Sequence, residues 1–180
     1  LRGQHVRCGG TLVSAEFFGM IERAIDDKPA KPHAMTTTNF SHEVSLRITH
    51  PSIDPEDISR ALSIAPTCAG KAGSGRTTPK GHPLPGVNRE TFWLYHFGRK
   101  AKGETGALPE TLVAMNQSLS SKREFLRALR DSGGRVEYFI GWFTDFNSGE
   151  VLDWRLLQQC GDLGIDLALD VYGHREISGD

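Results

Sequence analysis

The sequence predicts an α+β domain in which a mixed, largely antiparallel sheet carries its helices mainly on one face. Two observations support this class. Apolar residues alternate with polar ones along Val44–Thr49 and again along Ile165–Val171, which is the pattern of strands with one buried face. Helical patterns separate the strands, so tight hairpins cannot join them all. The order strand, helix, short strand, strand, helix, strand, helix, strand favours a ferredoxin-like core of split βαβ units.

The first helix follows the first strand directly. Asp54 is a good N-cap, and Pro55 occupies the first helical position, where its missing N–H costs nothing. Pro66 predicts that this helix ends near Ser63, because the residue before a proline avoids the helical conformation. The segment thus predicts one short helix of about two turns.

A long basic loop is expected next, since residues Gly70–Arg89 are rich in Gly and Pro. The following segment, Thr91–Phe97, is aromatic on both faces and predicts a central strand that is covered on both sides. A second two-sided apolar strand is predicted over Arg135–Phe143. These two strands would form the middle of the sheet.

Three further helices complete the expected order. A short one spans Pro109–Asn116, and a second begins at Ser121, which forms a capping-box pair with Glu124, and ends at Gly133–Gly134. Asp153 caps the last helix, which should end near Gly161 or Gly164. Its inward-facing residues are predicted to be Leu156, Leu157 and Cys160.

The first 34 residues allow two interpretations. The chain begins with Leu1, and the linker-like run Lys28–His33 precedes Met35, which suggests that Met35 is the true start. Alternatively, Ala15–Ile25 forms an N-terminal helix. In either case we expect residues 1–34 to lie outside the fold, residues 35–173 to form a single α+β domain, and residues 174–180 to form a polar tail.

Composition narrows the class of protein. The 180 residues carry a net charge of −1, so the whole chain attracts neither nucleic acid nor anionic lipid. The aromatic strands lack interleaved Lys and Arg, and we expect no nucleic-acid partner. The longest strongly apolar run, Tyr138–Phe143, is too short to span a bilayer. The three cysteines are far apart and odd in number, which favours a reducing compartment and a cytoplasmic location.

One motif suggests phosphate binding. Gly70–Thr77 matches a P-loop, but Arg76 replaces the essential lysine, and Pro79 lies in a coil where the P-loop helix should start. We therefore expect no nucleotide site. The histidines form no metal-ligand set and no catalytic pair is recognisable, so no metal, cofactor or catalytic residue is predicted. The remaining candidates for ligand or partner binding are Lys71, Arg76, Lys80, Arg89 and Trp93.

A family resemblance rests on three features of the chain. Pro66-Thr67, Trp93 and the run Leu163–Tyr172 occur in the order found in a bacterial family catalogued as domain of unknown function 4279, which the chain resembles over about residues 41–172. The resemblance implies a small cytosolic bacterial protein. It carries over no catalytic residue.

These observations favour a binding protein over an enzyme. The leading hypothesis is a non-enzymatic domain that binds a protein partner through its sheet edge or basic loop, in the manner of a small immunity or regulatory protein. One alternative is a small-molecule or anion binder that uses the basic loop 70–89. Another is an enzyme whose site is assembled from distant residues. The sequence sets no oligomeric state.

Overall fold

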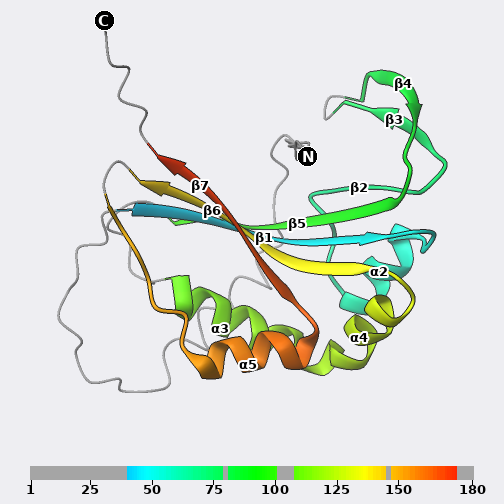
Figure 1. Ribbon diagram of the computed structural model, residues 1–180. Coiled ribbons are helices and arrows are strands. Elements are labelled where there is room, and N and C mark those ends of the chain that lie inside the picture. The colour runs from blue at the N-terminus through cyan, green and yellow to red at the C-terminus, as the bar shows by residue number, and fades with distance from the viewer. Residues whose placement is uncertain (1–39, 79–80, 101–107, 145–146, 174–180) are drawn as a thin grey trace, which may run out of the picture.

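The computed structural model describes residues 40–78, 81–100, 108–144 and 147–173. They form a five-stranded sheet with helices on one face, and a separate two-stranded hairpin at one end (Figure 1). The strands are β1 (Phe40–His50), β2 (Cys68–Gly70), β3 (Gly75–Thr77), β4 (Pro83–Val87), β5 (Thr91–Lys100), β6 (Arg135–Thr144) and β7 (Asp166–Gly173). The helices are α2 (Pro55–Leu62), α3 (Leu108–Leu119), α4 (Arg123–Asp131) and α5 (Trp154–Leu163), with a short 3-10 helix η1 (Ser120–Lys122) before α4.

The strand order of the main sheet is β2-β5-β1-β6-β7. Strand β1 lies in the centre and pairs antiparallel with β5 on one side and with β6 on the other. The parallel pair is β6–β7, which α5 connects. The predicted α+β class with a mixed, mostly antiparallel sheet is therefore confirmed. The ferredoxin-like detail is not confirmed, because β6 and β7 are direct neighbours and not the separated strands of a split βαβ unit.

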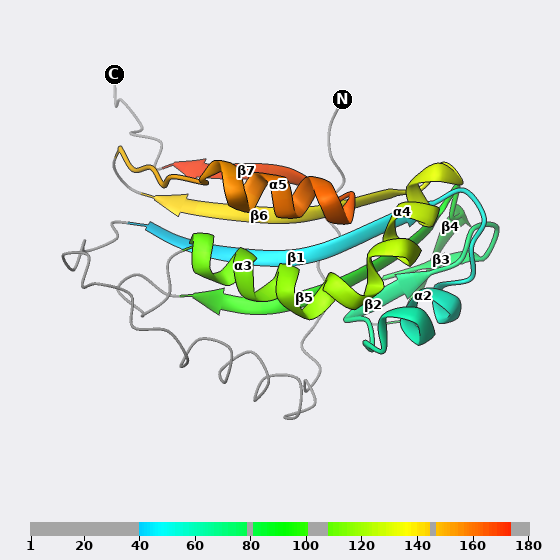
Figure 2. The same cartoon turned by 90° about the horizontal axis from the view of Figure 1, so that it is seen from below.

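The alternating pattern of β1 determines which side of the sheet forms the core. Val44, Leu46 and Ile48 are at most 1% exposed and face the helices, whereas Arg47 lies on the opposite side and is only half-buried. Figure 2 shows α3, α4 and α5 side by side under the same face of the sheet. The hydrophobic effect therefore holds the helix layer and this face of the sheet together.

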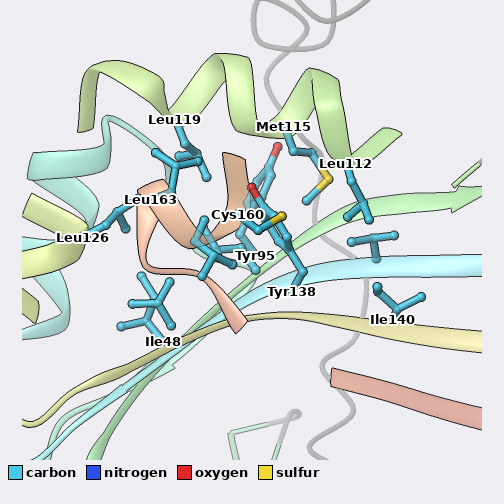
Figure 3. Packing of buried hydrophobic residues seen from close by; sticks show 14 of the residues in the cluster. Ile48, Tyr95, Leu112, Met115, Leu119, Leu126, Tyr138, Ile140, Cys160 and Leu163 are labelled. Atoms are coloured by element: carbon cyan, nitrogen blue, oxygen red, sulfur yellow. The ribbon is translucent and has the colours of Figure 1, made fainter. Parts of the chain in front are cut away.

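The core contains a small polar network. The hydroxyl group of the fully buried Tyr138 donates to Asn116 Oδ1 at 2.9 Å, and Asn116 Nδ2 donates to Cys160 Sγ at 3.4 Å. Figure 3 shows Tyr138 and Cys160 among the apolar side chains of the two layers, including Met115 and Ile140. The network thus links β6, α3 and α5, and it satisfies polar groups that would otherwise be costly to bury.

The ends of α2 and α5 follow the predictions. Asp54 accepts a hydrogen bond from the Glu56 N–H at 3.0 Å, and Asp153 accepts one from the Leu156 N–H at 2.9 Å. Helix α2 ends at Leu62, and its C-cap Ser63 has a φ of 58°, in the left-handed region that glycine usually occupies. These side-chain caps fix both helix starts because they satisfy otherwise unpaired N–H groups.

The predicted capping box at Ser121 is wrong. Helix α3 is longer than expected and ends at Leu119, and the chain continues without an extended residue into η1 and then α4. The position before α4 is Lys122, and it makes no side-chain capping bond. A side-chain cap needs an extended backbone at the N-cap, which the continuous helical turns do not provide.

Two other local predictions need correction. Residues 70–89 contain a hairpin, in which β3 and β4 pair antiparallel, instead of a structureless loop. Among the described residues, helices cover one face of β5 and β6 only, and on the other face Phe92 and Phe139 are half-buried. The predictions for residues 1–34 and for the tail 174–180 concern segments outside the described residues.

Candidate functional site

The five residues predicted to bind a ligand do not converge on one place. Lys71 donates to Asp54 Oδ2 at 2.6 Å, and this ion pair raises the pKa of Lys71 and lowers that of Asp54. Arg76 in β3 and Arg89 after β4 are both exposed. Arg76 and Arg89 are thus exposed cations at the hairpin, while Lys71 is held by the cap of α2.

The remaining two candidates are Lys80 and Trp93. Lys80 lies outside the described residues. Trp93 is 1% exposed, and its indole N–H donates to Ser59 Oγ at 3.0 Å within the core. A side chain in this position packs in the core, although Trp93 also contributes to the lining of the pocket described below. Residues 70–77 do not form a P-loop. Residues 75–77 belong to strand β3, whereas a P-loop would lead into a helix at this point.

The face of the sheet opposite the helices, which we call the open face, contains a pocket of about 290 Å³. Its floor consists of neighbouring residues from three antiparallel strands: Leu94, Arg47 and Glu137 form one row across the sheet, and Phe92, Thr49 and Arg135 form the next. The complete lining is Arg47, Ile48, Thr49, Cys68, Glu90, Phe92, Trp93, Leu94, Arg135 and Glu137. The pocket therefore combines two cations, two carboxylates and an apolar wall.

Arg47 is the central side chain of this pocket. Its guanidinium carbon lies 3.3 Å from the centre of the Phe139 ring, which holds the planar group against an aromatic face. Its Nε is buried and has no hydrogen-bond partner among the residues that the structure describes. Burial lowers the pKa of Arg47, and nearby Glu137 acts in the opposite direction. An arginine starts from a pKa so high that it stays charged, so its free donor would suit an anionic group.

His96 lies farther along the same face, opposite Ser45 of β1. Its Nδ1 is buried without a hydrogen-bond partner, and burial lowers the pKa of its ring, which Arg47 lowers further and Glu43 raises. Among the residues that the structure describes, no group of three His, Cys, Asp or Glu side chains could hold a metal ion. The open face thus presents two arginines of the pocket and, farther along, the His96 imidazole.

A second surface lies at the other edge of the sheet. Five exposed apolar side chains belong to α5, the segment before it, and β7, and we call them the edge surface. They are Val151 (77% exposed), Trp154 (64%), Leu157 (47%), Leu169 (52%) and Val171 (62%). Single exposed apolar residues are common, but a group of large ones on adjacent elements is typical of an interaction site.

The sequence pattern placed part of this surface in the core. Leu157 was expected inside α5, and Leu169 and Val171 were expected on the buried face of β7. Strand β7 turns away from the helix layer toward its end, so its last residues extend beyond α5 (Figure 1). The alternation along a strand shows which residues share a face, but it does not show where the covering helix stops.

Strand β7 is also an edge strand. It pairs with β6 on one side, and no strand of the described chain pairs with its other side. Edge strands carry unpaired N–H and C=O groups, which can accept a further strand. The described part of the chain therefore has two candidate surfaces, the pocket of the open face and the edge surface.

The comparisons with known proteins assign a family. The family model described as Domain of unknown function (DUF4279) matches residues 37–174, and the chain belongs to this family. No curated protein and no solved structure matches the chain.

None of the helices in the described ranges is long and apolar enough to cross a membrane. Cys160 is a buried free thiol.

Proposed function

We propose that this chain is a non-enzymatic protein-binding domain, immunity-like or regulatory, that uses the edge surface of α5 and β7. The observation that carries the proposal is the coincidence of exposed apolar side chains with an unpaired strand edge. Main-chain hydrogen bonds to an edge strand supply affinity, and flanking apolar side chains supply specificity. A bacterial and cytoplasmic setting remains part of the proposal.

Affinity capture with a matched pair of variants tests this proposal. The immobilised chain is compared with Trp154→Asp, which places a charge in the edge surface, and with Leu84→Asp, which changes a 39% exposed apolar residue on the hairpin. We expect the wild type and Leu84→Asp to retain the same protein and Trp154→Asp to lose it. Capture that is equal in all three would refute a role for the edge surface.

A second candidate function is the binding of a small anionic molecule at the open face. The Arg47 guanidinium group that lines the pocket beside the Phe139 ring favours it, since guanidinium N–H groups bind carboxylates and phosphates. This moves the anion-binding hypothesis from the basic hairpin to the pocket. Thermal-shift measurements with inorganic phosphate and benzoate distinguish the two places. Loss of the shift in Arg47→Lys would support the pocket, and loss in Arg76→Ala would support the hairpin.

A further inference from the structure

The pocket of the open face contains opposite charges that do not pair with each other. Its lining includes four charged residues, Arg47, Glu90, Arg135 and Glu137. Arg47 and Glu137 lie directly opposite each other on β1 and β6, where the Cβ atoms of a strand pair are about 4.5–5.5 Å apart. Within the described chain, however, none of the four residues makes an ion pair. The pocket therefore offers charges of both signs to a ligand.

The position of the Arg47 side chain explains why the cross-strand ion pair does not form. Its guanidinium group lies over the Phe139 ring, 3.3 Å from the ring centre. Phe139 is the next residue of β6 on this face after Glu137, so the stacking draws the guanidinium group one row along the sheet. The N–H groups of a guanidinium lie in its plane, and a ring against that plane leaves the terminal N–H groups available to a carboxylate.

The charge balance of the lining disfavours a simple anion. Two arginines and two glutamates give the lining no net formal charge. A phosphate ion would meet Glu90 and Glu137 as well as the arginines, and like charges that are brought together weaken binding. A ligand with one group of each sign would instead place its anionic group at Arg47 and its cationic group at Glu137. Electrostatic complementarity thus favours a zwitterion.

The size and the apolar part of the pocket restrict this zwitterion further. A volume of about 290 Å³ lies at the lower end of the range of ligand pockets, roughly 300–1,000 Å³, and suits a small molecule. Leu94 lies opposite Arg47 on the side away from Glu137, and Phe92 follows in the next row of the same wall. Because Arg47 and Glu137 are adjacent across the strands, the two charged groups of the ligand should be close together, as they are in an α-amino acid.

We propose that the pocket of the open face binds an α-amino acid with an apolar side chain. Arg47 binds the carboxylate, Glu137 binds the ammonium group, and Phe92 and Leu94 contact the side chain. This inference rests on the second candidate function, anion binding at the open face, and adds the cationic and apolar groups of the ligand. Both polar contacts are charge-assisted, which makes them stronger than hydrogen bonds between neutral groups.

Isothermal titration calorimetry at pH 7 with matched probes tests the inference. L-phenylalanine carries both charges, 3-phenylpropionate lacks the ammonium group, and 2-phenylethylamine lacks the carboxylate. We expect each of the latter two to bind at least about tenfold more weakly than L-phenylalanine, because a hydrogen bond to a charged group contributes about that much. Glycine should also bind more weakly, since it has no side chain to contact Phe92. Glycine that binds as tightly as L-phenylalanine would overturn the apolar part of the assignment.

A matched pair of variants tests the role of Glu137. In Glu137→Gln, L-phenylalanine and 3-phenylpropionate should bind within about twofold of each other, since the charged partner of the ammonium group is gone. Glu43→Gln changes a half-buried glutamate on the same face of β1, outside the pocket lining, and should keep the full difference. An equal loss of this difference in Glu43→Gln would refute the assignment of Glu137.

The wild-type result separates this inference from the function on which it rests. If 3-phenylpropionate binds as tightly as L-phenylalanine and this binding is lost in Arg47→Lys, the inference is overturned and anion binding at the open face stands. If 2-phenylethylamine binds most tightly, both are overturned. Both also fail if neither these probes nor phosphate and benzoate bind at about 10 mM, the range of weak specific binding.

Discussion

The buried hydrogen bond between Tyr138 and Asn116 allows a quantitative test of the core. Tyr138→Phe removes the donor and leaves Asn116 Oδ1 with only the Cys160 sulfur, 3.9 Å away. Asn116→Leu removes the acceptor and leaves the Tyr138 hydroxyl group unpaired in a fully buried position. Each single change should therefore cost about 1–3 kcal/mol of unfolding free energy, since an unsatisfied buried polar group keeps its desolvation penalty.

The double variant should cost less than the sum of the two single variants. It removes both polar groups and leaves an apolar contact of similar shape, so we expect a difference of at least about 1 kcal/mol between the sum and the measured value. The physical reason is that the penalty arises from an unpaired partner, and the double variant leaves neither of the two partners unpaired.

Urea denaturation at pH 7, followed by circular dichroism, measures these free energies. Tyr172→Phe is the matched control, because it makes the same chemical change at a side chain that is 41% exposed, and it should shift stability by less than about 0.5 kcal/mol. Additive single costs, or a Tyr138→Phe cost as small as that of the control, would show that the hydrogen bond does not stabilise the fold.

Three further predictions use the same measurement. Trp93→Ala should cost about 3–5 kcal/mol because the indole is buried, whereas Trp154→Ala should stay within about 0.5 kcal/mol; equal effects would contradict the core assignment. Gly70→Ala should destabilise the domain, since the new Cβ would collide with the Phe92 ring, and the control Gly75→Ala meets open space; a harmless Gly70→Ala would contradict this packing. The pKa of His96 is lower in the folded state than in the unfolded state. As the pH drops, the unfolded state therefore takes up the proton before the folded state does, and the free energy of unfolding should fall below a pH of about 6.5. This fall should be smaller in His96→Gln, and an identical pH dependence would exclude His96 as its source.

Features determined by neighbouring residues could be predicted from the sequence. Asp54 and Asp153 were recognised as helix caps because a cap depends on a side chain and an N–H group two or three residues away. The family and the α+β class were also predicted correctly. In each case the physical cause lies within one short segment or in a repeated pattern.

Features that depend on distant segments could not be predicted. Arg47 lies opposite Glu137 and Leu94 only because β6 and β5 pair with β1 in one register, and nothing local to Arg47 indicates either neighbour. The pocket was therefore missed, although the alternation along β1 had placed Arg47 outside the helix-covered core. The exposure of Leu169 depends on how far the helix layer extends along β7, which is again a property of the assembled layers.

The central position of β1 has a consequence for how the domain forms during synthesis. The strand emerges before both of its partners, and β6, which covers one whole side of it, is made only after α3 and α4. A nascent chain that ends before β6 therefore holds an apolar strand with an open side, which is a substrate for chaperones and a site for aggregation. Because β1 lies in the centre of the sheet and β6 is far away in the sequence, we expect the pairing of these two strands to be a slow step of folding.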